Sequence, residues 1–143
     1  MLTTVDVELA SHLRLVVTRL ARRLRQESGG GLTPSQTSAL ATVARHGPVT
    51  PSELADLERV KRPTATRVIG GLEEAGLVAR EPDPTDGRVC RVQATGAGNE
   101  LLAELRSRKT AYLAQRLARL DQTELATLER AASLIERLLE DEQ

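Results

Sequence analysis

Apolar residues repeat every three or four positions in three long stretches, at about 5–27, 97–119 and from 122 onward. This period predicts amphipathic α-helices, because the apolar side chains then share one face. Three glycines at 29–31 end the first helix, and Thr95 caps the second. The apolar positions are Leu9, Leu13, Val16, Val17, Leu20 and Leu24; Leu101, Leu102, Leu105, Tyr112, Leu113 and Leu117; and Leu125, Leu128, Ala132, Ile135 and Leu139.

Three shorter helices are predicted between these long ones. The first two open with the capping-box pattern T-P-S-Q or T-P-S-E, at 33–36 and 50–53. A break around 59–61 separates the second short helix from a third, which has Pro63 in its first turn. Two short helices joined by a tight turn form a helix-turn-helix, a unit that places its second helix in the DNA major groove.

Two short strands with a stiff turn between them follow the helix-turn-helix. We expect strands near 77–81 and 88–95, joined by P-D-P-T-D-G. The two prolines restrict this turn, and Asp86-Gly87 suits a corner with a positive φ, so Arg88 follows on a rigid arm. The predicted fold class is mainly α with a small β-hairpin wing: a winged helix-turn-helix plus a helical dimerisation region.

The composition excludes several classes of function. Tyr112 is the only aromatic residue, so nothing can stack on unpaired bases, and single-stranded nucleic acid is disfavoured. One cysteine excludes an internal disulfide and fits the cytoplasm. We expect no signal peptide, no membrane partner and no cofactor. His12 and His46 lack a ligand cluster, so no metal site is predicted, and no catalytic motif indicates an enzyme.

Charges are segregated along the chain, although the formal net charge is zero. Residues 59–72 and 87–98 contain arginines and a lysine but no acid. Residues 121–143 instead contain seven acids and two arginines. A protein that binds a polyanion on one side needs this kind of segregation.

The basic segments coincide with the predicted helix-turn-helix and wing. The second helix can enter the major groove with its N-terminus first, while the hairpin reaches the neighbouring minor groove. A rigid arginine suits the narrow minor groove of A·T-rich DNA. The acids Glu73 and Glu74 lie at the far end of the helix. The candidate DNA-binding residues are Arg62, Thr64, Thr66 and Arg67 on the helix, and Arg88 and Arg91 on the wing.

These segments resemble the multiple-antibiotic-resistance regulator (MarR) family of winged-helix transcription factors. The resemblance covers nearly the whole chain, through LTPSQTSAL (32–40), VTPSELADLERVKRPTATRVIGGLEEAGLVAR (49–80), DPTDGR (83–88) and VQATGAG (92–98). It implies an obligate dimer, joined by its first and last two helices, that binds a palindromic operator. It also implies that Asp86 orients the wing and that the arginine two residues later enters the minor groove.

The resemblance further implies that a small molecule, usually aromatic or phenolic, releases the DNA by entering a cleft between the dimerisation and DNA-binding parts. We assign Leu13, Val17, Leu40 and Leu105 to this cleft. The chain departs from the family at Gly70-Gly71, where polar or charged residues are usual. We interpret these glycines as close packing sites, because each costs about 1 kcal/mol relative to alanine inside a helix.

The long helices themselves also predict a partner. A helix of about 23 residues is about 35 Å long, more than a small winged-helix domain needs. An uncovered leucine stripe of this size is most commonly covered by a twofold copy. We therefore divide the chain into a dimerisation helix at 1–32, a DNA-binding domain at 33–96 and dimerisation helices at 97–143.

The predicted function is a homodimeric, cytoplasmic repressor that binds double-stranded DNA and responds to a small molecule. One alternative is a thiol-based redox sensor using Cys90, although we expect this residue to be part of the core because it shares a strand face with Val92 and Ala94. Another is a winged-helix adaptor that contacts only proteins; the acid-free basic segments argue against it.

Two further expectations concern the long helices. Tyr112 has helical spacing with the leucines around it, so we expect it in the core. Arg22, Arg23 and Arg25 are expected on a solvated face of the first helix.

Overall fold

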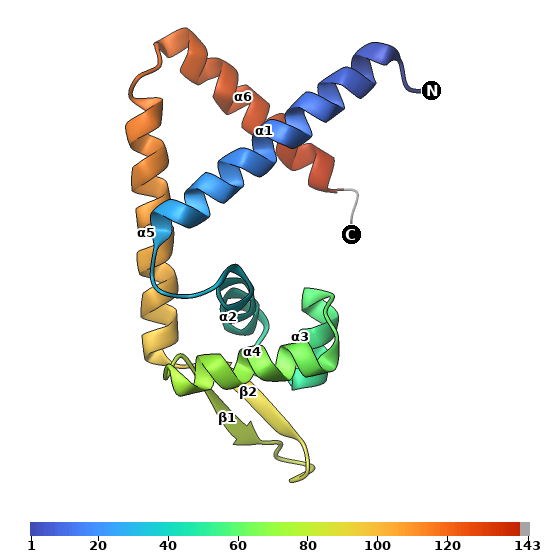
Figure 1. The fold of residues 1–143 in the computed structure, drawn as a ribbon, viewed down its shortest axis with the longest axis vertical. Coiled ribbons are helices and arrows are strands. Elements are labelled where there is room, and N and C mark those ends of the chain that lie inside the picture. The colour runs from blue at the N-terminus through green and yellow to red at the C-terminus, as the bar shows by residue number, and fades with distance from the viewer. Residues whose placement is uncertain (141–143) are drawn as a thin grey trace.

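A computed structural model of the chain describes residues 1–140 (Figure 1). Asp141 and Glu142, two of the acids noted in the sequence, lie outside the described residues, as does the end of the region 97–143. The elements are α1 (Thr4–Ser28), α2 (Pro34–His46), α3 (Pro51–Glu58), α4 (Arg62–Glu74), β1 (Val78–Pro82), β2 (Cys90–Ala94), α5 (Gly96–Leu117) and α6 (Gln122–Leu139). The predicted fold class is confirmed, and every predicted element is present.

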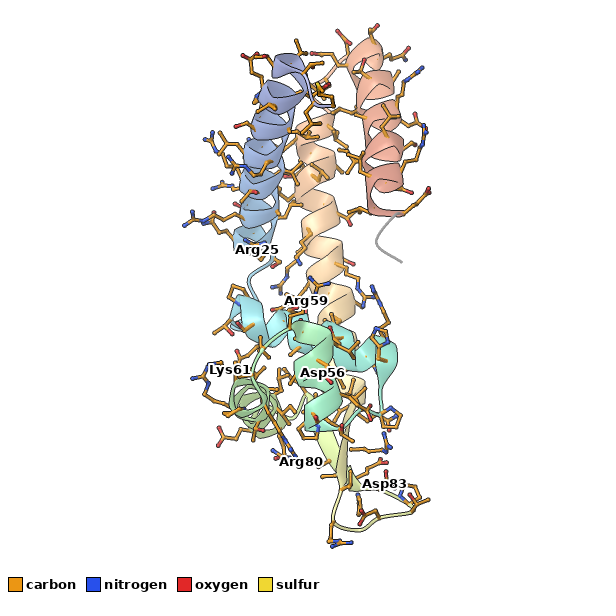
Figure 2. All side chains as sticks on the ribbon, turned by 90° about the vertical axis from the view of Figure 1, so that its right-hand side faces the viewer. Arg25, Asp56, Arg59, Lys61, Arg80 and Asp83 are labelled. Carbon is orange, nitrogen blue, oxygen red and sulfur yellow. The ribbon has the colours of Figure 1, made fainter. Side chains whose placement is uncertain are left out.

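The elements form a small winged unit and three long helices. Helices α2, α3 and α4 pack together above the antiparallel hairpin β1–β2, and α5 rises from this unit as a column (Figure 1). Helix α1 packs on α5, and α6 returns from the far end of α5. Although α1 and α6 cross in Figure 1, Figure 2 shows them on opposite sides of α5. The two outer helices therefore each lie beside α5 and not against each other.

The aliphatic core lies in the winged unit. Its apolar side chains come from α2, α3, α4, both strands and the start of α5. Val49, just before α3, pairs with Val92 of β2 through two backbone hydrogen bonds of 3.0 and 2.7 Å, so the base of the hairpin is fixed to the helices. The largest fully buried side chains are Leu40, Val43, Leu54, Ile69, Leu72 and Val92.

Side-chain caps begin most helices where the sequence predicts them. Thr33 and Gln36 exchange hydrogen bonds in both directions at the start of α2. Asp121 and Glu124 do the same at the start of α6, and the Thr95 side chain caps α5. These contacts are local in sequence, which is why the helix starts are predictable.

The capping box predicted for α3 is only half formed. Thr50 Oγ1 accepts a hydrogen bond from the Glu53 amide at 3.0 Å. The Glu53 carboxylate does not return the bond and lies instead 3.5 Å from the guanidinium of Arg91 on β2. Glu53 therefore connects α3 to the wing, and the second half of the predicted box is wrong.

The helical glycines of α4 differ in their surroundings. A Cβ atom at Gly71 would lie 2.9 Å from Nε2 of Gln36 on α2, so close packing is confirmed there. A Cβ atom at Gly70 would meet nothing within 4 Å, so the same prediction is wrong at this position.

Gly98 lets α5 start directly against the core. A Cβ atom there would overlap the carbonyl oxygen of Leu77 and lie 3.2 Å from Cδ1 of Leu40. We expect Gly98→Ala to lower the free energy of unfolding by about 1–3 kcal/mol, the usual cost of overpacking a core. Urea unfolding measures this, and Gly96→Ala, whose Cβ would meet nothing within 4 Å, is the control. Equal unfolding midpoints for the two variants would contradict the prediction.

Helices α1 and α6 expose most of their large apolar residues. Helix α6 buries none of its residues, and α1 buries only Ser28. Among residues 1–140, none of the helices combines the length and the apolar character that crossing a bilayer demands. The exposed large apolar residues of these two helices are Val5, Val7, Leu9, Leu15, Val16, Val17, Leu20, Leu125, Leu128, Leu134, Leu138 and Leu139.

Tyr112 is half-buried between α1 and α5, so its predicted place in the core is wrong. Its hydroxyl accepts a hydrogen bond of 3.0 Å from Nε of Arg23, and the Arg116 guanidinium lies 4.9 Å from the ring centroid. Arg23 is therefore held at a helix contact instead of lying on a purely solvated face. Arg22 and Arg25 are exposed, as predicted.

Candidate nucleic-acid interface

The N-terminal end of α4 is a site of free backbone amides and positive charge. Arg59 closes α3 in a left-handed conformation, with φ 55°, and the chain turns directly into α4. No side chain caps the first amides of α4, and its first turn contains no acid. A helix N-terminus of this kind favours phosphate, because its amides and dipole both attract anions.

The predicted recognition residues of α4 differ in exposure. Arg62, Thr66 and Arg67 are exposed, and the two arginines form no ion pair within residues 1–140. Thr64 is half-buried and lines a cavity of about 310 Å³ between α2, α3 and α4. Three of the four residues are therefore accessible, as is Lys61, which projects from the turn before α4 in Figure 2.

The turn of the wing is organised by the carboxylate of Asp83. Its Oδ1 accepts hydrogen bonds from the Thr85 amide at 2.8 Å, the Thr85 hydroxyl at 2.7 Å and the Asp86 amide at 3.2 Å. Its Oδ2 accepts from Nε of Arg91 at 2.7 Å. The Thr85 hydroxyl and amide, together with the Arg91 guanidinium, hold the pKa of Asp83 well below its usual range. The carboxylate is therefore charged and fully bonded at any physiological pH.

Arg88 projects from the far side of this turn. Asp86 Oδ1 accepts a hydrogen bond of 3.1 Å from the Arg88 amide and lies 3.5 Å from Arg88 Nε. The Arg88 side chain is nonetheless 95% exposed. An arginine that is held at its backbone and whose exposed guanidinium has only a long contact with Asp86 is suited to insert into a groove.

The predicted corner with a positive φ at Asp86-Gly87 is wrong. Within the described residues, positive φ values occur at Gly29, Gly30, Gly31 and Gly76 and at Arg59. The chain instead turns through side-chain hydrogen bonds to Asp83 and a backbone hydrogen bond of 3.0 Å from the Val89 amide to the Asp86 carbonyl. An Asx-type turn does not need the conformation that only glycine adopts readily.

Arg91 does not point freely into solvent with Arg88. Its guanidinium contacts Asp83 at 2.7 Å and Glu53 at 3.5 Å, so both of its contacts are carboxylates of this chain. The sequence indicated Arg91 as a DNA contact only through its charge; it placed Glu53 in a capping box and Asp83 in the turn, and did not connect either of them with Arg91. The D-x-T-D pattern at 83–86 is the local signal for the turn. The link to Glu53 joins segments that are distant in sequence and has no such signal.

Cys90 and the two histidines add no further chemistry to this surface. Cys90 is a half-buried free thiol on β2. Val92, on the same strand face, is fully buried, whereas Cys90 is only partly buried and is not among the buried residues of the core cluster. The alternative of a redox sensor at Cys90 stays untested. Over residues 1–140, no three side chains of the metal-binding types lie close enough together to hold an ion.

A basic crevice lies at the junction of the long helices and the winged unit, between α1, α2 and α5. Two adjoining cavities of about 270 and 360 Å³ form it and share Arg25, Pro34, Thr37 and Lys109 in their walls. Figure 2 shows Arg25 at the end of α1 nearest the winged unit. Neither cation forms an ion pair within the described part of the chain. We call this cavity pair the junction crevice.

The four residues assigned to an effector cleft lie apart from the junction crevice. Leu40 and Leu105 are fully buried side chains of α2 and α5. Leu13 is half-buried and Val17 exposed, both on α1. None of the four is among the residues that line the two cavities. Their role in ligand binding stays a prediction.

The chain is similar to known regulators over both the winged unit and the long helices. The MarR family model matches residues 30–89. An HTH-type transcriptional regulator of Mycobacterium tuberculosis is 42% identical over 137 residues, which are 95% of this chain and 96% of the relative. The HTH-type transcriptional repressor MdtR of Bacillus subtilis is 28% identical, over 82% of this chain and 79% of MdtR.

The fold is equally similar to a solved structure. The crystal structure of a transcriptional regulator protein from Pseudomonas aeruginosa matches with a TM-score of 0.87 and 37% sequence identity. The match covers 97% of this chain and 99% of that one. Both terminal helices therefore belong to the shared architecture.

Proposed function

Because this chain belongs to the MarR family of DNA-binding transcriptional regulators, we propose that it is a repressor that binds a palindromic operator as a homodimer. The observation that carries the proposal is the accessible basic surface formed by α4 and the wing. Arg62 and Arg67 on α4 and Arg88 on the wing are all exposed, and within residues 1–140 the one acid that pairs with any of them is Asp86, two residues before Arg88. The similar protein MdtR is a transcriptional repressor, which supports repression as the direction of regulation.

In this proposal, residues 33–96 contact the DNA, and residues 1–32 and 97–143 form the dimer. The support is the apolar surface that α1 and α6 leave uncovered in the single chain. An uncovered apolar surface of this extent exceeds the few scattered apolar residues that a monomeric protein normally exposes. A second copy of the chain, related by a twofold axis, would cover it. Two copies of α4 would then contact half-sites about one DNA turn, roughly 34 Å, apart.

Selection of bound genomic fragments tests this function. The purified chain is expected to retain duplexes that share an inverted repeat, and binding to a selected duplex should weaken steeply as salt rises. We refer to this duplex as the selected operator. A chain that retains no duplex above background would instead support the adaptor alternative.

We also propose that the junction crevice binds the small molecule that releases the DNA, and that this molecule is anionic. The support is that Arg25 and Lys109 both line the crevice and form no ion pair within residues 1–140. The crevice joins α1 and α5 to the first helix of the winged unit, so an occupant can change their relative position.

A comparison of benzoate with phenol tests the charge preference. Benzoate should release the selected operator at a lower concentration than phenol, because its carboxylate can pair with Lys109. Lys109→Ala should raise the benzoate concentration needed by about tenfold, the effect of one lost charged hydrogen bond, and leave phenol unaffected. Fluorescence anisotropy of labelled operator measures release. Equal sensitivity of wild type and variant to benzoate would exclude this site.

A further inference from the structure

One arginine side chain connects the tip of the wing to the helix-turn-helix. Arg91 lies on β2, and its Nε donates to Asp83 in the wing turn at 2.7 Å. Its Nη1 lies 3.5 Å from Oε1 of Glu53 in the first turn of α3. Three segments that are separate in sequence therefore meet at one guanidinium.

The surroundings distinguish this cluster from an ordinary surface ion pair. The Asp83 side chain is only 8% exposed, and its second oxygen holds the turn through Thr85 and Asp86. Glu53 stands at the position that completes a capping box, as Gln36 and Glu124 do at the starts of α2 and α6. At α3 the box stays open because the carboxylate is turned to Arg91.

The hairpin needs such a connection because its outer half has little other support. Nearer its base, the hairpin is linked to the helices by the two backbone hydrogen bonds between Val92 and Val49 and by the ion pair between Arg80 of β1 and Glu73 of α4. Beyond Val78, the residues of β1 are exposed. A two-stranded ribbon is marginally stable by itself, so its tip can swing unless a side chain holds it.

We infer that Arg91 is a positioning residue for DNA recognition: it holds the wing at a fixed span from α3 and α4, so that Arg88 and the recognition helix reach adjacent grooves together. In this role Arg91 acts through Arg88 and contacts no DNA itself. The inference rests on the proposed function and adds to it the residue that aligns the two contacts.

A double-mutant cycle on the selected operator tests the inference. Arg88→Ala is expected to weaken binding at least about tenfold in the wild-type background. In an Arg91→Ala background the same substitution should weaken operator binding less than about twofold, because the wing no longer holds Arg88 in place to contact the DNA. An equal cost of Arg88→Ala in both backgrounds would overturn the inference.

Arg80 provides a matched control. Like Arg91, it is an arginine of the hairpin that forms an ion pair, and its side chain is 34% exposed against 32% for Arg91. Its partner, however, is Glu73 of α4, so the pair does not involve the turn of the wing. Figure 2 shows Arg80 closer to the helices and Asp83 further along the wing. The cycle between Arg80→Ala and Arg88→Ala should be additive, and coupling as large as that of Arg91 would overturn the inference.

Two further variants separate positioning from a loss of folding. Arg62→Ala should weaken binding by the same factor with and without Arg91→Ala, because α4 keeps its place; a changed factor overturns the inference. Glu53→Gln removes the charged partner of Arg91 on α3 without altering the wing. In this background too, Arg88→Ala should weaken operator binding less than it does in the wild type. If the wild-type chain retains no duplex, the proposed function and this inference are both overturned. If the chain binds DNA but Arg88→Ala weakens binding by the same factor with and without Arg91→Ala, this inference alone is overturned.

Discussion

Replacing Arg88 with alanine is expected to weaken binding to the selected operator by about 2–6 kcal/mol. A groove contact of this kind contributes about 1–3 kcal/mol, and a symmetric dimer makes it twice at separate half-sites. The side chain touches only Asp86 within the described chain, at 3.5 Å, and such an exposed pair contributes little to folding. The variant should therefore remain folded and dimeric while it loses affinity.

Equilibrium anisotropy at one fixed salt concentration measures this loss, with urea unfolding to check the fold. Arg119→Ala is the control: this exposed arginine lies in the turn between α5 and α6, at the end of the molecule opposite the wing (Figure 1). It should bind like the wild type. Arg88→Ala should also bind A·T-rich and G·C-rich flanks more equally, because minor-groove width attracts the arginine. Unchanged affinity in Arg88→Ala would refute the wing assignment.

The helices and the wing were predictable because their signals are local. The capping partners at the starts of α2 and α6 lie three residues apart, and the glycines after α1 stand directly at its end. The proline in the first turn of α4 and the break before it follow the same logic. Each of these features depends on a few neighbouring residues, so short sequence patterns are enough to predict the helices and the wing.

The contacts that position the wing could not be read in this way. Arg91 and Glu53 are 38 positions apart, and a sequence that contains many arginines and acids does not say which of them meet. The charge of Arg91 alone therefore suggested a DNA contact. Tyr112 presents the same difficulty, because its hydroxyl partner Arg23 is 89 positions away.

Helical periodicity has a further limit in the long helices. It shows that α1, α5 and α6 each have an apolar face, but not which neighbour covers that face. Leu105 of α5 is covered within the chain, whereas Leu128 of α6 is not. The location of the proposed effector site could not be predicted for the same reason, since only the packed structure shows that Arg25 and Lys109 line the same crevice.

Leu128→Glu is expected to raise the dissociation constant of the dimer at least about a hundredfold. Burying a leucine contributes about 1.5–3 kcal/mol, and twofold symmetry removes two leucines per dimer, so about 3–6 kcal/mol is lost. The new carboxylates add a desolvation cost. The chain itself should stay folded, because Leu128 is 46% exposed within it and glutamate is nearly as good a helix former as leucine.

Sedimentation at a series of concentrations measures the dissociation constant, and the matched control is Leu57→Glu. Leu57 of α3 is also 46% exposed but lies in the winged unit, so the same change should leave the dimer intact. Operator binding by Leu128→Glu should become weak and concentration-dependent, because a monomer contacts one half-site and must dimerise to contact both. If Leu128→Glu sediments as a dimer at the same concentrations as the wild type, α6 is not part of the interface, and the proposed pairing of half-sites needs another surface.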